Sequence, residues 1–137
     1  IVCGTYNNYL NIFSIYKSRF INKIQLNSVP NKILITTNMG FIIVYCHKEI
    51  YLLTINGFLI KNIQLEIEVS KWCSYSDKGI DYICVSDLNN KIYIFEAFYP
   101  EKIKFISKID SKIISLNNRG GNIDVISAKG DVYVISF

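Results

Sequence analysis

A short motif occurs four times along the chain at nearly constant spacing, and this repeat limits the fold more than any other feature. Each copy places a polar turn before alternating apolar residues, and the copies occupy residues 7–13, 47–53, 89–95 and 129–135. Their first apolar residues lie 40, 42 and 40 positions apart, in the series Leu10, Ile50, Ile92 and Val132. A repeat of about 40 to 45 residues is typical of the four-stranded blade of a β-propeller.

Further strands are predicted on both sides of each motif. A short apolar strand precedes every copy, at residues 1–5, 41–46, 82–87 and 123–127. Turn-forming residues separate three of these from an earlier strand, at residues 33–37, 69–75 and 113–116. A last strand follows the first three copies, at residues 20–26, 59–65 and 102–109. Strands, turns and repeat length therefore agree on antiparallel blades of four strands.

The repeat thus predicts an all-β fold, a partial β-propeller of about three and a half antiparallel blades in one domain. Residues 1–26 form a blade without its first strand, residues 33–65 and 67–109 form complete blades, and residues 113–137 form a blade without its fourth. Known propellers have four or more blades. We therefore expect the chain to be part of a longer protein whose other blades cover its apolar faces.

The composition also favours strands. Half of the 137 residues are hydrophobic and 14% are aromatic, which is ample material for a core. There are only two alanines, Ala97 and Ala128, and one methionine, so helix-forming residues are scarce. The chain contains no signal-peptide pattern and no apolar run of about 18 residues. We expect a soluble cytoplasmic protein, with a location at membrane surfaces as an open alternative.

The period and strand order resemble those of WD-repeat proteins, although the signature residues of that family are absent. Where those repeats carry Asp, this chain has Asn7, His47, Asn89 and Lys129. Where they carry Trp, it has Phe13, Leu53, Phe95 and Ile135. We therefore expect packing, rather than the buried hydrogen-bond network of typical blades, to hold these blades together.

A narrower resemblance covers residues 40–137. Residues 40–45 and 50–60, with the Leu-Thr-Ile-Asn-Gly stretch at 53–57 as the best marker, are similar to the C-terminal WD-repeat region of BEACH-domain proteins of the beige and neurobeachin type. The resemblance implies a non-catalytic scaffold that binds other proteins in vesicle traffic or membrane dynamics. It also implies that further blades and a BEACH domain, which these residues do not contain, belong to the parent protein.

No catalytic, metal or cofactor site is predicted. The single histidine, His47, has no cysteine, serine or carboxylate placed to form a catalytic set with it, so we interpret it as a turn residue. Gly120 and Gly121 lack the Lys and Ser or Thr that complete a phosphate-binding loop, and a hairpin turn is the simpler interpretation. The acidic residues show no calcium-loop spacing.

The four cysteines indicate a reducing compartment. Cys3, Cys46, Cys73 and Cys84 lie 43, 27 and 11 positions apart, without the close pairs that zinc sites use. A disulfide between Cys73 and Cys84 would fit a hairpin, but cysteines inside apolar strands are more often reduced core residues. We therefore predict four thiols in the core.

Lysines supply the one charge pattern that suggests a binding site. Strict alternation predicts that Lys102, Lys104 and Lys108 share one face of a strand, with Ile103, Phe105 and Ile109 on the other. Lysines on an outer strand discourage unwanted pairing between sheets. The functional alternative is contact with an anionic membrane or a phosphorylated lipid. Nucleic-acid binding is disfavoured, because the net charge is only +4 and no basic stripe alternates with aromatics.

Trp72 is predicted on the strand face opposite Val69, Lys71 and Cys73, where it packs between blades or, alternatively, anchors a partner. Three functions remain open from the sequence. The first is the BEACH-type interaction scaffold. The second is a coat-type propeller that binds membranes or phosphoinositides, and the third is a structural domain of a larger enzyme.

Overall fold

The computed structural model describes residues 1–137, which form fourteen strands and no helix. The first sheet contains β1 (Val2–Gly4), β2 (Tyr9–Ser14) and β3 (Arg19–Gln25). The second contains β4 (Lys32–Ile35), β5 (Ile42–Cys46), β6 (Glu49–Leu53) and β7 (Leu59–Gln64). The third contains β8 (Val69–Asp77), β9 (Ile80–Asp87), β10 (Lys91–Glu96) and β11 (Lys104–Lys108). The fourth contains β12 (Ile113–Arg119), β13 (Asn122–Ser127) and β14 (Val132–Ile135).

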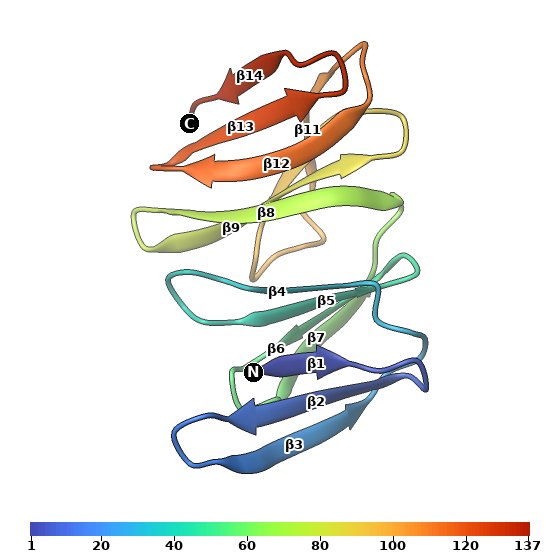
Figure 1. Ribbon diagram of the computed structural model, residues 1–137, viewed down its shortest axis with the longest axis vertical. Coiled ribbons are helices and arrows are strands. Elements are labelled where there is room, and N and C mark those ends of the chain that lie inside the picture. The colour runs from blue at the N-terminus through green and yellow to red at the C-terminus, as the bar shows by residue number, and fades with distance from the viewer.

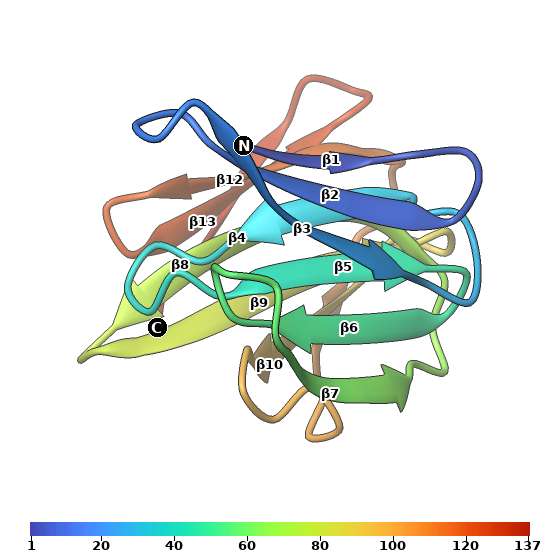
Figure 2. The same cartoon turned by 90° about the horizontal axis from the view of Figure 1, so that it is seen from below.

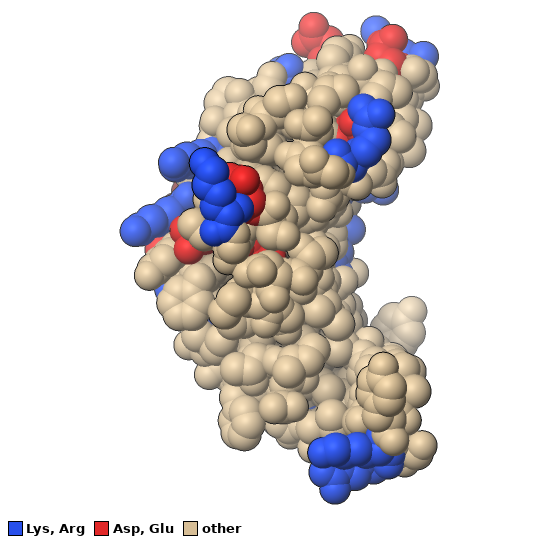
Figure 3. Space-filling model, turned by 90° about the vertical axis from the view of Figure 1, so that its left-hand side faces the viewer, with Lys and Arg blue, Asp and Glu red and all other residues tan.

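Each sheet is built from consecutive antiparallel strands, which confirms the predicted all-β class and blade pattern. The sheets pack face to face in chain order, with the first and fourth at opposite ends of the molecule (Figures 1 and 2). The stack curves into an open arc, as Figure 3 shows from the side. One face of the first sheet and one face of the fourth therefore have no neighbouring sheet.

The hairpin turns explain why the repeat motif is regular. His47 and Lys48 join β5 to β6 with φ angles of 42° and 67°, and Gly120 and Gly121 join β12 to β13 with φ angles of 60° and 91°. Two successive residues with positive φ define the turn whose twist matches that of the flanking strands. His47 is thus an exposed turn residue and the glycine pair is a hairpin turn, as the sequence predicts.

Three apolar clusters fill the spaces between successive sheets. The cluster between the first two sheets includes Leu10 and Leu53, and the next includes Ile43 and Ile83. The last lies between the third and fourth sheets. At about 25 cal/mol per Å² of buried apolar surface, such interfaces provide the main stabilisation of the stack. The loops at the strand ends are therefore carried on a packed scaffold.

A β-bulge at the start of β8 corrects the predicted surroundings of Trp72. Val69 pairs with Asp87 and Lys71 pairs with Ser86, so Ser70 is the extra residue. The bulge brings Val69 onto the same face as Trp72, and both belong to the cluster between the second and third sheets. The prediction that Val69 and Trp72 lie on opposite faces was wrong, because it assumed strict alternation. The expected packing of Trp72 between blades is confirmed.

Hydrogen bonds join neighbouring sheets in addition to the packing that the sequence predicts. The carboxylate of Asp81, 3% exposed, accepts hydrogen bonds from the backbone N–H groups of Asn38 at 2.9 Å and Met39 at 2.7 Å. The side chain of Asn38 donates to the carbonyl of Gly79 at 2.6 Å. The turn between β4 and β5 is thereby fixed to the turn between β8 and β9.

The cysteines are free, and three of them are buried. Cys73 lies directly opposite Cys84 in the β8–β9 hairpin. The neighbouring Cys73 thiol and burial raise the pKa of Cys84, which keeps that thiol protonated. Cys3 is exposed on β1, so its predicted place in the core was wrong, because no sheet packs on that face of the first sheet.

Candidate functional site

The two ends of the sheet stack differ in polarity. Six loops gather at one end, on the left in Figure 1: residues 15–18, 36–41, 54–58, 78–79, 97–103 and 120–121. We call this the aromatic end, because exposed apolar side chains lie in or beside these loops. They are Ile15, Tyr16, Met39, Ile55, Phe58, Leu59, Ile80, Phe98, Tyr99 and Phe137. Figure 3 faces this end and shows a mostly uncharged surface with a few separate groups of charges.

The opposite end is polar. It contains the turns of the repeat motif and the connections between sheets. Exposed charged and polar residues there are Asn7, His47, Lys48, Glu66, Glu68, Asn89, Asp110, Lys112, Lys129 and Asp131. Large exposed apolar patches on a soluble protein mark interaction sites more often than a scattered polar surface does. The aromatic end is therefore the better candidate for a binding site.

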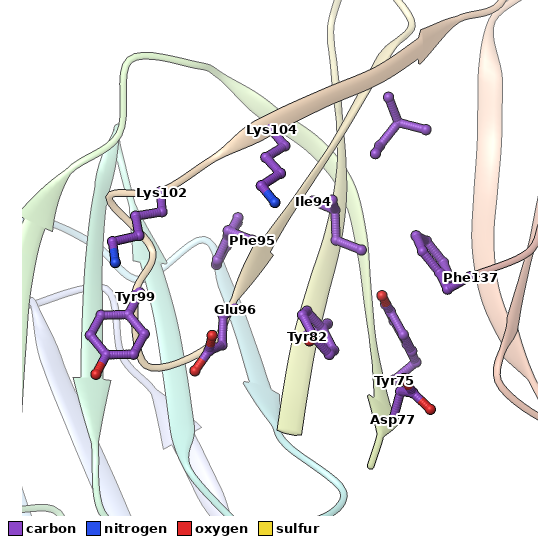
Figure 4. Close-up of a pocket in the computed structure, with 11 residues that line it drawn as sticks. Tyr75, Asp77, Tyr82, Ile94, Phe95, Glu96, Tyr99, Lys102, Lys104 and Phe137 are labelled. Carbon is purple, nitrogen blue, oxygen red and sulfur yellow. The ribbon is translucent and has the colours of Figure 1, made fainter. Parts of the chain in front are cut away.

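Two adjoining pockets hollow the aromatic end beside the third sheet. The larger, of about 400 Å³, lies between the third and fourth sheets and is drawn in Figure 4. The smaller, of about 250 Å³, is lined by Met39, Ile80 and Phe98 among others. Glu96 and Tyr99 line both pockets. We call the two pockets together the Glu96 groove.

An aromatic stack forms one wall of the larger pocket. The ring of Tyr75 lies 5.1 Å from that of Tyr82 and 4.6 Å from that of Phe137, with 15° between the planes in each pair. Tyr75 and Tyr82 are opposite each other in the register of β8 and β9, which brings their rings together. Burial raises the pKa of the Tyr75 hydroxyl, so this wall stays uncharged.

The loop between β10 and β11 is held by a lysine of the second sheet. The ammonium of Lys61 donates a hydrogen bond to the carbonyl of Phe98 at 2.7 Å and lies 3.5 Å from the carboxylate of Glu101. It also lies 4.6 Å from the centre of the Tyr99 ring, and Lys102 lies 4.7 Å from the same ring. These contacts between cations and an aromatic ring fix the wall of the Glu96 groove.

The acidic residues of the groove have no such partner. The two ion pairs of the chain join Lys61 to Glu101 and Arg119 to Asp124. Glu96, which is half-buried, and Asp77, which is exposed, therefore lie in the pocket without a paired cation. Figure 4 shows Glu96 between Tyr82 and Tyr99, with Asp77 beside Tyr75.

The structure separates the three lysines that the sequence groups together. Lys102 lies in the loop before β11. Lys104 is opposite Ile94 and Lys108 is opposite Lys91, with a register shift between them that makes Ile106 the extra residue. Directly opposite residues share a face, and Lys91 and Ile94 lie on different faces of β10. The prediction of one shared lysine face was wrong because of this bulge.

All three lysines remain exposed on or beside β11, which is the edge strand of its sheet. This position suits the protection of an edge against unwanted pairing. Lys102 and Lys104 also line the larger pocket, as Figure 4 shows, whereas Lys108 lines a different one.

No group of three His, Cys, Asp or Glu side chains comes together in the way that a metal site needs. None of the elements is a helix that could cross a membrane. The side chain of His47 is exposed in its turn, and its backbone N–H donates to the side chain of Asn31 at 3.3 Å.

The sequence reasoning missed the Glu96 groove. Its residues come from several separate segments, and only the sheet packing brings them together. One local signal was present in the sequence. The loop between β10 and β11 contains two adjacent aromatic residues, Phe98 and Tyr99, outside the strands that form the core. Adjacent aromatic residues in a loop are typical of binding surfaces.

By sequence, the chain matches no known family and no curated protein. By structure, it is similar to the Pan2 WD40 domain of Neurospora crassa, with a TM-score of 0.68, 16% identity, and coverage of 98% of this chain and 42% of that one. It is also similar to BBS1N in its complex with ARL6DN, with a TM-score of 0.72, 13% identity, and coverage of 99% of this chain and 52% of that one. A chain of the Mitotic Checkpoint Complex matches with a TM-score of 0.70, 9% identity, and coverage of 99% of this chain and 45% of that one.

The chain therefore spans about half the length of these solved chains or less. The similarity extends over nearly all of the present residues, and the sheet order agrees with the predicted blades. The fold is that of a partial WD40-type β-propeller.

Proposed function

We propose that this chain is a non-catalytic scaffold that binds other proteins through its aromatic end. The single observation that carries the proposal is the concentration of exposed apolar side chains in the six loops of that end. Phe58 is 69% exposed and Met39 is 60% exposed. Loops on a rigid sheet scaffold are the usual place for binding residues, and aromatic residues and methionine are enriched at protein interfaces.

Two of the structural neighbours support a binding role. BBS1N was solved in complex with ARL6DN, and another neighbour belongs to the Mitotic Checkpoint Complex. Propellers of this kind are thus found in assemblies with other proteins. By analogy, the partner of this chain is another protein rather than a small substrate.

The parent protein that we propose is a BEACH-domain protein of vesicle traffic or membrane dynamics, located in the cytoplasm. The support is the similarity of residues 40–137 to the WD-repeat region of that family, and the four free thiols suit a reducing compartment. The coding sequence upstream of Ile1 tests this proposal. A BEACH domain there would support it, whereas a catalytic domain or a coat-type propeller would contradict it.

Site-specific photo-crosslinking tests the binding role itself. A photoreactive phenylalanine analogue replaces Phe58 at the aromatic end, and in a matched chain it replaces Leu88, which is 66% exposed at the polar end. We expect discrete adducts with a partner protein from position 58 in cells and none from position 88. Equal adducts from both positions, or adducts from position 88 alone, would contradict binding through the aromatic end.

A further inference from the structure

We propose that the Glu96 groove binds an arginine side chain of a partner peptide, together with an apolar residue next to that arginine. This proposal rests on the proposed function, since it names the chemistry by which the aromatic end recognises a partner. Its starting point is a half-buried carboxylate that has no cation of its own.

The electrostatics of the groove favour a cationic ligand. Glu96 lies in the wall that both pockets share, and neither of the two ion pairs of the chain includes it. Asp77 adds a second unpaired carboxylate to the larger pocket. A carboxylate that is partly removed from water is stabilised by a paired cation with good hydrogen-bond geometry. A guanidinium at Glu96 would supply that pairing.

The neighbouring lysines do not fill this role. Lys61 is paired with Glu101 and the Phe98 carbonyl, and Lys102 lies over the Tyr99 ring. Lys104 also lines the larger pocket, but it is exposed and has neither an ion pair nor an aromatic ring beneath its ammonium. Lys104 is an exposed residue, whereas Glu96 is half-buried, so the ammonium keeps more of its hydration than the carboxylate does. The groove therefore has more to gain from a cationic ligand than from an anionic one.

The aromatic rings favour arginine over lysine. Glu96 is paired with Tyr82 in the register of β9 and β10, and Tyr99 lines the same pocket, so a planar group that binds the Glu96 carboxylate would have aromatic side chains near it (Figure 4). Guanidinium stacks on aromatic faces and forms paired hydrogen bonds with a carboxylate, which a single ammonium does not. The stack of Tyr75, Tyr82 and Phe137 extends this apolar wall.

The smaller pocket provides the place for an apolar neighbour. Met39, Ile80 and Phe98 line it, on the other side of Glu96 and Tyr99 from the larger pocket. Its floor is firm, because Asp81 holds the backbone of Asn38 and Met39. An apolar side chain beside the arginine would bury surface there without ordering a loop.

Fluorescence polarisation with a defined peptide tests the proposal. The probe is a fluorescein-labelled hexapeptide, Gly-Ser-Leu-Arg-Ser-Gly, and its matched control carries citrulline, which keeps the shape of arginine without the charge. The protein variants are Glu96→Gln and the control Glu66→Gln, which removes an exposed and unpaired carboxylate at the polar end. Circular dichroism checks that each variant is folded.

We expect saturable binding to the unchanged chain and to Glu66→Gln. Binding should weaken at least about tenfold with Glu96→Gln, and by a similar factor with citrulline, because each change removes one member of a charge-assisted pair. Equal affinity for both peptides, no effect of Glu96→Gln, or no saturation up to about 1 mM peptide would overturn the proposal. Loss of self-association in Glu96→Gln would also overturn it, because the occupant would then be a second copy of this chain.

The result is separable from the test of the proposed function. If the peptide fails to bind while Phe58 still yields a partner adduct, only the arginine assignment is wrong. If position 58 yields no adduct, the role of the whole aromatic end fails.

Discussion

The carboxylate of Asp81 in the third sheet accepts a 2.7 Å hydrogen bond from the backbone N–H of Met39 in the second sheet. The two residues are 42 positions apart, about one repeat, so this contact joins equivalent ends of neighbouring blades. The same carboxylate accepts a second bond from Asn38. A buried charge thereby stabilises the turn that carries Met39 at the aromatic end.

Replacement of Asp81 by alanine should destabilise the chain strongly. Two hydrogen bonds to a charged group are lost, and two backbone N–H groups lose their acceptor, so the free energy of unfolding should fall by about 3 kcal/mol. Urea unfolding followed by circular dichroism measures the change. Asp77→Ala is the matched control, because Asp77 is exposed and unpaired, and it should leave the midpoint nearly unchanged. Equal midpoints for the two variants would show that the link contributes little.

Gly57 should not tolerate alanine. Its φ is +86°, and an added Cβ would lie 2.7 Å from the Cδ1 atom of Ile12 and 2.9 Å from that of Ile24. The clash and the backbone strain together should lower the free energy of unfolding by about 2 kcal/mol or more. Gly40 has a φ of +68° with open space around it, so Gly40→Ala carries the strain alone. In urea unfolding, Gly57→Ala should have a lower midpoint than Gly40→Ala. The reverse order would contradict the contact of Gly57 with Ile12 and Ile24 of the first sheet.

Stability should fall in alkaline solution. Burial, followed by the Glu49 carboxylate, raises the pKa of the Cys46 thiol to about 11 from 9.0. A folded-state pKa above the unfolded one gives stability that is complete below the unfolded pKa and is lost as pH rises toward the folded one. Burial raises the pKa of Tyr51 in the same direction.

The urea midpoint should therefore decrease between about pH 8 and about pH 11. Cys46→Ala should show a smaller decrease than the unchanged chain, since it lacks one of the responsible groups. A midpoint that stays constant or rises over this interval would contradict the assignment of Cys46 to the core.

We do not expect the lysines on and beside β11 to make the chain prefer anionic over neutral membranes. Lys104 and Lys108 lie on different faces of β11, so they do not form one continuous basic face. Liposome sedimentation should give equal binding with and without anionic lipid. A clear preference for anionic vesicles, lost on replacing Lys102, Lys104 and Lys108 by glutamine, would restore the membrane hypothesis.

The sequence predicts the blades well because short stretches of neighbouring residues determine where each strand begins, ends and reverses. Turn residues such as His47 and Gly121 fix where strands reverse, and alternating apolar residues fix which strands are buried. The bulges at Ser70 and Ile106 were not predictable, because one extra residue in a ladder depends on how the sheets pack. Each bulge then exchanged the faces of all side chains on one side of it.

The candidate site was even less accessible to sequence reasoning. The charge pattern directed attention to Lys104 and its neighbours, whereas the groove depends on Glu96, which has no recognisable motif around it. Its importance comes from what surrounds it, since Tyr82 belongs to another strand and Phe137 follows the last strand of the fourth sheet. Only the three-dimensional arrangement shows that this carboxylate is half-buried and unpaired.

The outer faces of the first and fourth sheets carry exposed apolar side chains, as expected for an open section of a propeller. Phe13 and Phe20 form an exposed ring pair 5.3 Å apart on the first sheet, and Val132 and Val134 are 58% and 49% exposed on the fourth. In a closed propeller such faces are covered by neighbouring blades.

Sedimentation velocity of the isolated chain over a range of concentrations shows whether these faces are unprotected in solution. We predict concentration-dependent self-association that Phe13→Lys and Val134→Lys weaken, while Tyr6→Lys at the polar end, where Tyr6 is 96% exposed, leaves it unchanged. A stable monomer at every concentration would contradict the open-section account and would indicate that the four sheets form a complete domain.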